Sequence, residues 1–327
     1  MRILIITRLY APHFGGVEKH ISETSKILAK KHQITILTER YDQALLEKEK
    51  IDGVQVIRFS HSNKKLIGLF SIWYWIFRNR RFVENADIVH IHDVFIWYLP
   101  FKFLFPKKPV VTTFHGWEQT FPIPLKNKII RKVSALLSDK TVSVGKYLDD
   151  FYGTKSDLFL YGAVDKKRFN KIKKTVPLIF LGRLESDTGT KTVLKMLAKN
   201  KLKIRFIGDG SYRDKCSKFG ITGQVDDVDK VLRKTKICIA SGYLSAIEAL
   251  SNRCKVIVVA DTKIRKAIWN STPFSQFITI TRDEKELLLA IRRNSNKKII
   301  NEAEKWAKTQ TWDHIVGEYE VLYNVLI

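Results

Sequence analysis

Short runs of apolar and β-branched residues alternate along this chain with longer stretches in which apolar residues recur at helical spacing. In the first half, the expected strands cover residues 3–7, 34–38, 54–59, 88–91, 110–114, 141–144 and 158–160. The helices expected between them cover residues 17–30, 66–81, 95–105, 125–137 and 146–152. This alternation predicts an α/β fold, in which a parallel sheet is covered by helices.

The same alternation begins again after an irregular basic stretch at residues 165–175. Strands are expected there at residues 178–181, 204–207, 223–225, 237–240 and 256–259. The final segment, residues 298–327, is predicted to form two helices, the second of which we expect to pack back on the first domain. The pattern therefore predicts two tandem Rossmann-like domains. The first would comprise residues 1–164 with the helix at 311–327, and the second residues 165–310.

The composition is that of a globular protein, since 45% of the 327 residues are hydrophobic. A formal net charge of +25 would attract nucleic acid, acidic lipid headgroups or phosphorylated substrates, although a general lysine bias gives the same number. No zinc finger, RNP-like strand or basic recognition helix accompanies the charge, so no nucleic-acid partner is predicted. The three cysteines lack the spacing of a zinc site, and no metal is predicted. The first apolar run is too short for a signal peptide, which favours a cytoplasmic protein.

The junction at residues 236–250 is the strongest local indication of a ligand site. An apolar strand ends at Ala240, a tight turn contains Gly242, and a helix follows that carries Glu248. The amides at a helix N-terminus favour anionic groups, and a glycine lets a ligand approach the backbone closely. The carboxylate of Glu248 could accept hydrogen bonds from a ribose diol, or it could simply be a solvated helix residue.

Further motifs follow the ends of the expected strands, where the ligands of parallel sheets bind. In the first half they are GGVE at 15–18, HIHD at 90–93, TFHG at 113–116 and SVG at 143–145. In the second half they are GRLE at 182–185, TG at 188–189, GDG at 208–210 and SGYLSAIEAL at 241–250. In this order, over nearly the whole chain, they resemble the retaining GT-B glycosyltransferases of family 4, which include α-mannosyl-, α-glucosyl- and sucrose-type transferases.

The resemblance implies a nucleoside-diphosphate sugar donor, held mainly by the second domain, an acceptor held mainly by the first, and chemistry in a cleft between the two domains. It also implies retention of anomeric configuration without a bound metal or other cofactor, the donor phosphate accepting the acceptor's proton. Arg183 matches the arginine that grips the diphosphate, and its forked donors suit phosphate oxygens. The alternative for Arg183 is a surface ion pair. His115 corresponds to the active-site histidine that hydrogen-bonds the transferring sugar.

The resemblance also assigns the remaining site residues. Gly15 and Gly16 would let the donor phosphate or the acceptor approach the first helix, although a plain strand-to-helix turn would have the same pair. His92 and Asp93 are expected to shape the acceptor pocket. The other residues expected to contact the nucleotide are Gly208, Gly210, Val225, Gly242, Tyr243, Leu244, Ser245 and Glu248.

The chain departs from the family pattern at two positions. The family has a Glu-x7-Glu motif, in which Glu248 is the second carboxylate, whereas Ala240 stands at the first position, which usually grips the sugar. Thr188 stands where the family has a lysine, although Lys191 could reach the same phosphate. From the resemblance as a whole, we expect a hexosyltransferase that acts on a lipid-linked or glycan acceptor. The alternative is a catalytically weak or inactive GT-B subunit that binds nucleotide-sugar or glycan.

An aromatic-rich apolar stretch at residues 66–77 lies between basic clusters at residues 64–65 and 78–81. This composition is typical of an interfacial helix on an anionic membrane, and the stretch is too short to span a bilayer. If it is interfacial, Trp73 and Trp75 are expected to anchor the protein peripherally on the inner face of the membrane. Residues 95–105 could extend the same surface. The alternative is a core helix of the first domain with a solvated basic end.

Overall fold

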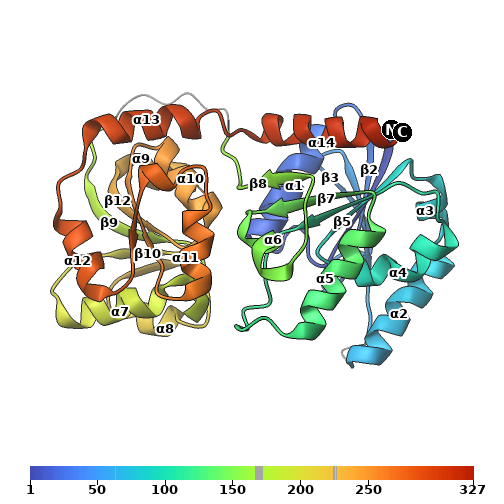
Figure 1. The fold of residues 1–327 in the computed structure, drawn as a ribbon, viewed down its shortest axis with the longest axis horizontal. Helices are drawn as coiled ribbons and strands as arrows, with labels where there is room; N and C mark the ends of the chain where they lie inside the picture. The colour runs from blue at the N-terminus through green and yellow to red at the C-terminus, as the bar shows by residue number, and fades with distance from the viewer. Residues whose placement is uncertain (63, 166–171, 224, 226) are drawn as a thin grey trace. The chain divides into compact units, whose positions relative to one another are not determined.

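The computed structural model describes residues 1–62, 64–165, 172–223, 225 and 227–327 (Figure 1). It divides the chain into two compact units. Unit 1 consists of Met1–Leu160 and Trp312–Ile327, and unit 2 of Tyr161–Thr311. The division falls after Leu160 rather than after residue 164.

The described part of unit 1 contains an eight-stranded sheet in the order β3-β4-β2-β1-β5-β6-β7-β8. The strands are β1 (Arg2–Thr7), β2 (Gln33–Glu39), β3 (Lys48–Ile51), β4 (Val54–Phe59), β5 (Ile88–His92), β6 (Val110–Phe114), β7 (Lys140–Val144) and β8 (Leu158–Leu160). Neighbouring strands are parallel, apart from the β3–β4 pair. The alternation of apolar strands and amphipathic helices therefore predicted seven of these eight strands.

Strand β3 is the element of this sheet that the hydrophobic pattern missed. Its sequence Lys-Glu-Lys-Ile is mostly polar, because it is an edge strand with little to bury. The turn that joins it to β4 contains Asp52 and Gly53, both at positive φ (48° and 86°). An Asp-Gly pair in such a turn is a strong hairpin signal, so the sequence did contain the information.

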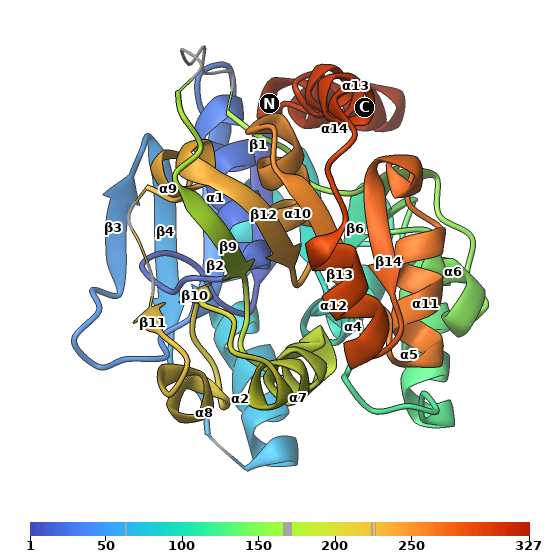
Figure 2. The same cartoon turned by 90° about the vertical axis from the view of Figure 1, so that its left-hand side faces the viewer.

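Helices cover both faces of this sheet. They are α1 (Gly16–Leu28), α2 (Lys65–Arg78), α3 (Arg81–Asn85), α4 (Phe95–Leu104), α5 (Leu125–Leu137), α6 (Tyr147–Tyr152) and α14 (Trp312–Leu326). Successive side chains of a strand point to opposite faces. On β5, Val89 and Ile91 belong to the apolar core that includes residues of α2 and α4, whereas His90 bonds to Tyr323 of α14. Thus α14 packs with α1 against one face, and α2 and α4 cover the other (Figures 1 and 2).

Helix α2 is shorter than the sequence suggested, because it ends at Arg78 and the separate short helix α3 begins at Arg81. The expectation that Trp73 and Trp75 face a membrane is wrong. The indole N–H of Trp73 donates to the backbone oxygen of Ile96 (2.9 Å), and Trp75 stacks on Phe59 with ring centroids 4.8 Å apart. Both tryptophans thus pack on the core of unit 1.

The described residues of unit 2 form a six-stranded parallel sheet in the order β11-β10-β9-β12-β13-β14. The strands are β9 (Val176–Leu181), β10 (Arg205–Ile207), β11 (Ile221–Gly223), β12 (Thr235–Ala240), β13 (Lys255–Val259) and β14 (Ile278–Thr281). The expected strand at 223–225 is instead Ile221–Gly223, and Gln224 lies outside the described residues. Strand β14 was not expected; its four residues, Ile-Thr-Ile-Thr, are too few to give a clear pattern.

The helices of unit 2 follow its strands in the usual alternation. They are α7 (Thr190–Lys199), α8 (Arg213–Ser217), α9 (Val228–Lys234), α10 (Tyr243–Ser251), α11 (Lys263–Asn270), α12 (Glu284–Arg292) and α13 (Lys297–Ala307), with short 3-10 turns at Ser186–Thr188 and Ser275–Phe277. The chain then leaves unit 2 after Thr311, and α14 returns to unit 1.

Candidate functional site

The carboxyl ends of β5 and β6 bring two predicted site residues together in unit 1. His92 is the last residue of β5 and is in register with Thr113 of β6, one strand over, so the chain places His115 just beyond it. Nδ1 of His92 lies 2.7 Å from Nε2 of His115, and the two rings stack with centroids 5.1 Å apart. Both histidines were predicted from the sequence as site residues, and the structure shows the hydrogen bond between them.

Two further histidines that sequence reasoning did not single out extend this cluster. His20 of α1 lies edge-on to the ring of His115, with centroids 4.9 Å apart, and its Nε2 bonds the hydroxyl of Tyr319 (2.8 Å). His90 lies between Tyr323 (Nδ1, 2.6 Å) and Thr113 (Nε2, 2.7 Å). Both Tyr319 and Tyr323 belong to α14. The C-terminal helix therefore closes a polar network beneath the candidate site.

Burial keeps these imidazoles uncharged at neutral pH. Desolvation lowers the pKa of His20, His90 and His92 well below the usual value, and the neighbouring histidines lower it further. Desolvation, with a contribution from the positive charge of Arg131, lowers the pKa of His115 to about 3. Because Nε2 of the neutral His115 is bonded to His92, Nδ1 is left to donate or accept one hydrogen bond, which suits a sugar hydroxyl.

Two residues fix the loop that carries His115. Asp93, at a left-handed φ of 62°, accepts a hydrogen bond from the backbone N–H of His115 (2.9 Å). Arg131 of α5 donates to the backbone oxygen of Gly116 (2.6 Å) and lies over the ring of Tyr152, 3.8 Å from its centroid. Arg131 is buried, although it stands among lysines in the sequence of α5. Nothing in the local sequence pattern distinguished it from its neighbours.

The glycine pair of the first motif opens α1. Gly15 is the N-cap residue, in extended backbone, and Gly16 is the first helical residue. A Cβ on Gly16 would meet no atom within 4 Å. Glu18 folds back toward Gly15 and pairs with Nδ1 of His13 (3.0 Å). The space beside Gly16 agrees with close approach of a ligand.

Arg183 follows β9 in unit 2, on an exposed loop. Its guanidinium donates to the carboxylate of Asp187 (2.9 Å), while Arg265 donates to the backbone oxygen of the same Asp187 (2.7 Å). Lys191 is exposed in the first turn of α7. Thr188 is buried, and its hydroxyl contacts the backbone oxygens of Arg183 and Glu185, both at 2.8 Å. Thr188, which stands where the family pattern has a lysine, therefore stabilises the fold of this loop.

Gly208 and Gly210 follow β10, both at positive φ (141° and 149°). A Cβ on Gly208 would lie 2.0 Å from the backbone oxygen of Gly182, and one on Gly210 would lie 2.6 Å from that of Leu184. Each glycine is thus required by the contact between the β9 and β10 loops, whether or not a ligand binds. Val225 is half-buried and packs against the apolar core of unit 2.

The motif at 241–250 forms the N-terminus of α10, as the sequence suggested. Gly242 is its N-cap, and the hydroxyl of Ser245 accepts from the N–H of Gly242 (3.2 Å). Tyr243 turns inward, with its hydroxyl donating to the backbone oxygen of Ile268 (3.0 Å). Leu244 is half-buried beside Gly162. Glu248 is only 9% exposed, so the interpretation as a solvated helix residue is wrong.

The arginine loop and the N-terminus of α10 are neighbours, because β9 and β12 are paired. Leu181 is in register with Ala240, and the N–H of Ser241 donates to the oxygen of Leu181 (3.0 Å). A Cβ on Gly182 would lie 1.8 Å from the hydroxyl oxygen of Ser241. Unit 2 thus places the loop that carries Arg183 beside a helix N-terminus. A cation on such a loop and helix-end amides are groups suited to a diphosphate.

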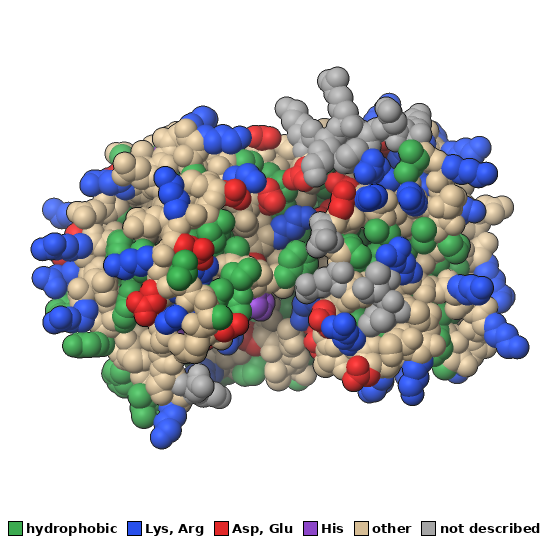
Figure 3. Space-filling model, turned by 180° about the vertical axis from the view of Figure 1, so that it is seen from behind, with side chains coloured by type: hydrophobic (Ala, Val, Ile, Leu, Met, Phe, Trp, Pro, Cys, Tyr) green, Lys and Arg blue, Asp and Glu red, His purple; other side chains and the backbone are tan. Residues whose placement is uncertain are grey.

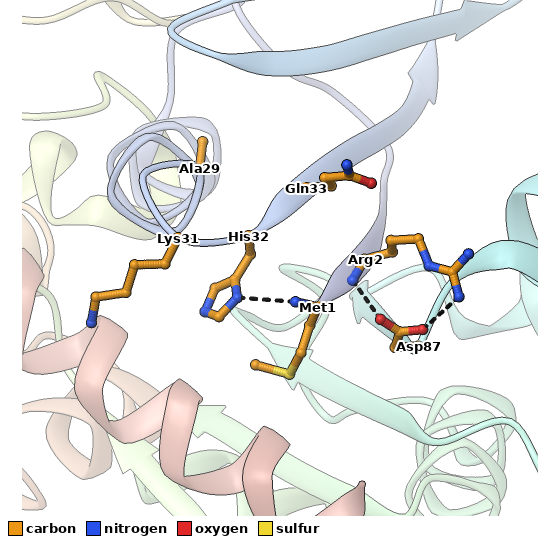
Figure 4. Close-up of a pocket in the computed structure, with 7 residues that line it drawn as sticks. All are labelled: Met1, Arg2, Ala29, Lys31, His32, Gln33 and Asp87. Carbon is orange, nitrogen blue, oxygen red and sulfur yellow. Dashed lines mark hydrogen bonds and ion pairs between the residues drawn. The ribbon is translucent and has the colours of Figure 1, made fainter.

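One open pocket lies at the other end of the unit 1 sheet, where β1 and β2 begin (Figure 4). Its ionic groups have partners: Arg2 pairs with Asp87 (2.9 Å), Lys31 pairs with Glu320 of α14 (3.4 Å), and the N-terminal amino group lies 3.5 Å from Nδ1 of His32. Across the described residues, no group of three His, Cys, Asp or Glu side chains is arranged to hold a metal ion. Within the same part of the chain, every helix is too short or too polar to traverse a bilayer.

Comparison with known proteins agrees with this arrangement. Residues 14–153 match the family model described as Glycosyltransferase Family 4. An uncharacterized glycosyltransferase of Methanocaldococcus jannaschii is 23% identical over 294 residues, covering 74% of this chain and 75% of that protein.

Solved structures resemble the chain over its whole length. Sucrose-phosphate synthase from Thermosynechococcus elongatus gives a TM-score of 0.77 at 12% identity, covering 99% of this chain and 98% of its own. Anabaena HepE, solved in complex with UDP and glucose, gives 0.73 at 12% identity, with 98% and 99% covered. The chain thus has the two-domain GT-B fold, and with the Family 4 match over residues 14–153 the findings support a glycosyltransferase of the family 4 type.

Proposed function

We propose that this protein is a retaining glycosyltransferase, which moves a hexose-type sugar from a nucleoside diphosphate to a lipid-linked or glycan acceptor. The observation that carries the proposal is the pairing of β9 with β12, which sets the loop of Arg183 beside the N-terminus of α10. A departing diphosphate gains negative charge, and a fixed cation with helix-end amides stabilises that charge without a bound metal. HepE, which has the same fold, binds UDP and glucose, so a uridine nucleotide is the first donor to test.

The remaining residues take roles that fit their surroundings. Glu248, buried on α10, accepts hydrogen bonds from the ribose hydroxyls, and Gly242 allows the nucleotide to approach the helix end. Lys191 shares the diphosphate with Arg183. Gly15 and Gly16 offer the amides of α1 to the donor or the acceptor. His115, uncharged and held by His92, hydrogen-bonds the transferring sugar.

A second candidate function is a nucleotide-sugar-binding subunit with little or no transfer activity. Two observations favour it. Ala240 is buried at the end of β12, so it offers no carboxylate to the sugar, and Thr188 is committed to backbone contacts in its loop. Both candidates predict donor binding, and only the enzyme predicts cleavage of the donor.

The test is a panel of nucleoside-diphosphate sugars, first by thermal shift and then by release of nucleoside diphosphate. Binding to the native state raises the melting temperature as the ligand concentration exceeds its Kd. Stabilisation with slow release, accelerated by an acceptor, supports the enzyme, and NMR of the product's anomeric proton then tests retention. Stabilisation without any release supports the binding subunit. If no donor stabilises the protein, both proposals fail.

A further inference from the structure

Helix α2 is apolar on both of its faces. Ile72 and Ile76 face inward and are almost fully buried in the core of unit 1. An outer stripe is left between 49% and 72% exposed, and it consists of Leu66, Phe70, Tyr74 and Phe77. A helix that is apolar all round normally has apolar surroundings on every side. We therefore expect a partner to cover the outer stripe of α2.

Helix α5 repeats this pattern. Arg131 and Ser134 are its buried positions, and a stripe on the other side is between 39% and 84% exposed. That stripe consists of Leu125, Ile129, Val133 and Leu136. Its spacings of four, four and three residues are those of the α2 stripe. Recurrence on a second helix distinguishes the feature from the isolated exposed apolar residues that are normal on any surface.

Helix α4 lies between these two helices and contacts both, as Figures 1 and 2 show. Its last turn adds the exposed Phe103 and Leu104. We call the exposed sides of α2, α4 and α5 the three-helix surface. It lies away from α1 and α14, which cover the other face of the sheet. Exposed apolar residues on neighbouring helices indicate an interaction site, because monomeric proteins seldom expose more than a few hundred Å² of apolar surface in one place.

The charge of the three-helix surface indicates what it binds. The sequences of α2, α4 and α5 contain lysine and arginine but no aspartate or glutamate. Basic residues also flank α2, at Lys64 and at Arg80 and Arg81. By contrast, α14 in the same unit carries Asp313, Glu318 and Glu320. Figure 3 shows apolar side chains mixed with basic ones over the part of unit 1 that contains α2.

We propose that the three-helix surface docks unit 1 on an anionic lipid bilayer. The apolar stripes enter the boundary between headgroups and acyl chains, and the exposed Arg78, Lys126 and Lys132 contact the anionic headgroups. Arg131 is buried and Lys102 pairs with Asp139, so these two do not take part. The helices lie in the plane of the membrane. This surface, rather than Trp73 and Trp75, anchors the protein. The proposal goes beyond the proposed function and needs neither donor nor acceptor, so the failure of one does not imply the failure of the other.

The test is co-sedimentation of the full chain with vesicles of phosphatidylcholine alone and of phosphatidylcholine mixed with phosphatidylglycerol. We expect binding to the mixed vesicles, weakened by added salt, which screens the attraction. Two double variants remove part of one stripe each: Phe70→Ser with Tyr74→Ser, and Ile129→Ser with Leu136→Ser. Each should weaken partitioning at least about tenfold, since two large apolar side chains no longer enter the bilayer. Circular dichroism checks that each variant is folded.

The matched control is Val321→Ser with Val325→Ser, which removes two side chains that are 61% and 70% exposed on α14. It should bind vesicles like the wild type. Equal binding to both kinds of vesicle, or no binding to either, would overturn the proposal. The same holds if the control weakens binding as much as the stripe variants do. A dimer in sedimentation velocity that the stripe variants dissociate would assign the surface to a second copy of the chain instead.

Discussion

Nδ1 of His92 and Nε2 of His115 lie 2.7 Å apart, one at the end of β5 and the other just past the end of β6. One of the two nitrogens must carry the proton in this contact, so the tautomer of one ring depends on that of the other. His92 thereby determines which group His115 offers to the substrate. This gives His92 a positioning role that can be separated from direct contact.

Replacing His92 by Phe should keep the stacked ring and remove the hydrogen bond to His115. We expect turnover to fall roughly ten- to a hundredfold, the scale of one lost hydrogen bond, with donor affinity nearly unchanged. His92→Asn, which retains a polar atom near the position of Nδ1, should recover part of the rate. Steady-state kinetics with donor titration measures both effects. Equal rates for His92→Phe and the wild type would show that His115 needs no such support.

Arg183→Ala should reduce turnover more than it reduces donor binding, because a fixed cation helps most when charge develops on the leaving group. The expected loss in kcat is roughly a hundredfold. Arg183→Lys keeps the charge but not the forked geometry, and should lie between the two. Asp187→Asn is the control for the ion pair that holds Arg183 in the structure. Wild-type turnover in Arg183→Ala would remove this residue from the diphosphate site.

Glu248→Gln should weaken nucleotide binding by about 1–3 kcal/mol, the cost of losing hydrogen bonds to a charged acceptor. Glutamine is preferred to alanine because Glu248 is buried, and alanine would also leave a cavity. Isothermal calorimetry on the folded variant measures the change. Unchanged affinity would show that the ribose lies elsewhere.

Gly208→Ala should destabilise the protein by about 1–3 kcal/mol or more, since the new Cβ meets the oxygen of Gly182 and φ is 141°. Gly242→Ala is the matched control. A Cβ there meets no atom within 4 Å and φ is −151°, so stability should hardly change. If Gly242 lies against the nucleotide, however, its variant should bind donor more weakly. Chemical denaturation and donor titration distinguish the two glycines, and a fully stable Gly208→Ala would contradict the loop contact.

The buried histidines predict that the free energy of unfolding decreases as the pH falls below about 6.5, the ordinary value for histidine. Because His20, His90 and His92 have lowered pKa values in the folded state, the unfolded chain binds protons that the native protein does not. Each contributes at most about 1.4 kcal/mol per pH unit.

Asp93, whose pKa desolvation raises to about 6, acts in the opposite direction, but it is exposed and solvent screens its effect. Urea denaturation at pH 7 and pH 5 tests the net change. A protein that is equally stable or more stable at pH 5 would refute the prediction.

The local sequence pattern predicted most strands of both sheets, the helices of the first half and of the C-terminal end, and the strand ends where the candidate site residues lie. It did so because a buried parallel strand must be apolar and the helix after it amphipathic, and both constraints are local. The motifs at strand ends could be predicted as well, because glycines such as Gly208 and Gly242 are typical of tight loops and of helix N-termini. The polar edge strand β3 and the short strand β14 were not predicted, because they have too few apolar positions to form a pattern.

Which side of each helix or strand is covered by other elements depends on the tertiary packing. Periodicity shows that residues share a face, but it does not show what that face meets. Trp73 and Trp75 therefore could not be separated from Phe70 and Tyr74 until α2 was packed on its core. Likewise, Arg131 stands among lysines in the sequence. It is buried because α5 packs against the loop after β6, where Arg131 donates to the backbone oxygen of Gly116. The bond between His92 and His115 joins residues 23 positions apart, and it exists because two parallel strands end side by side.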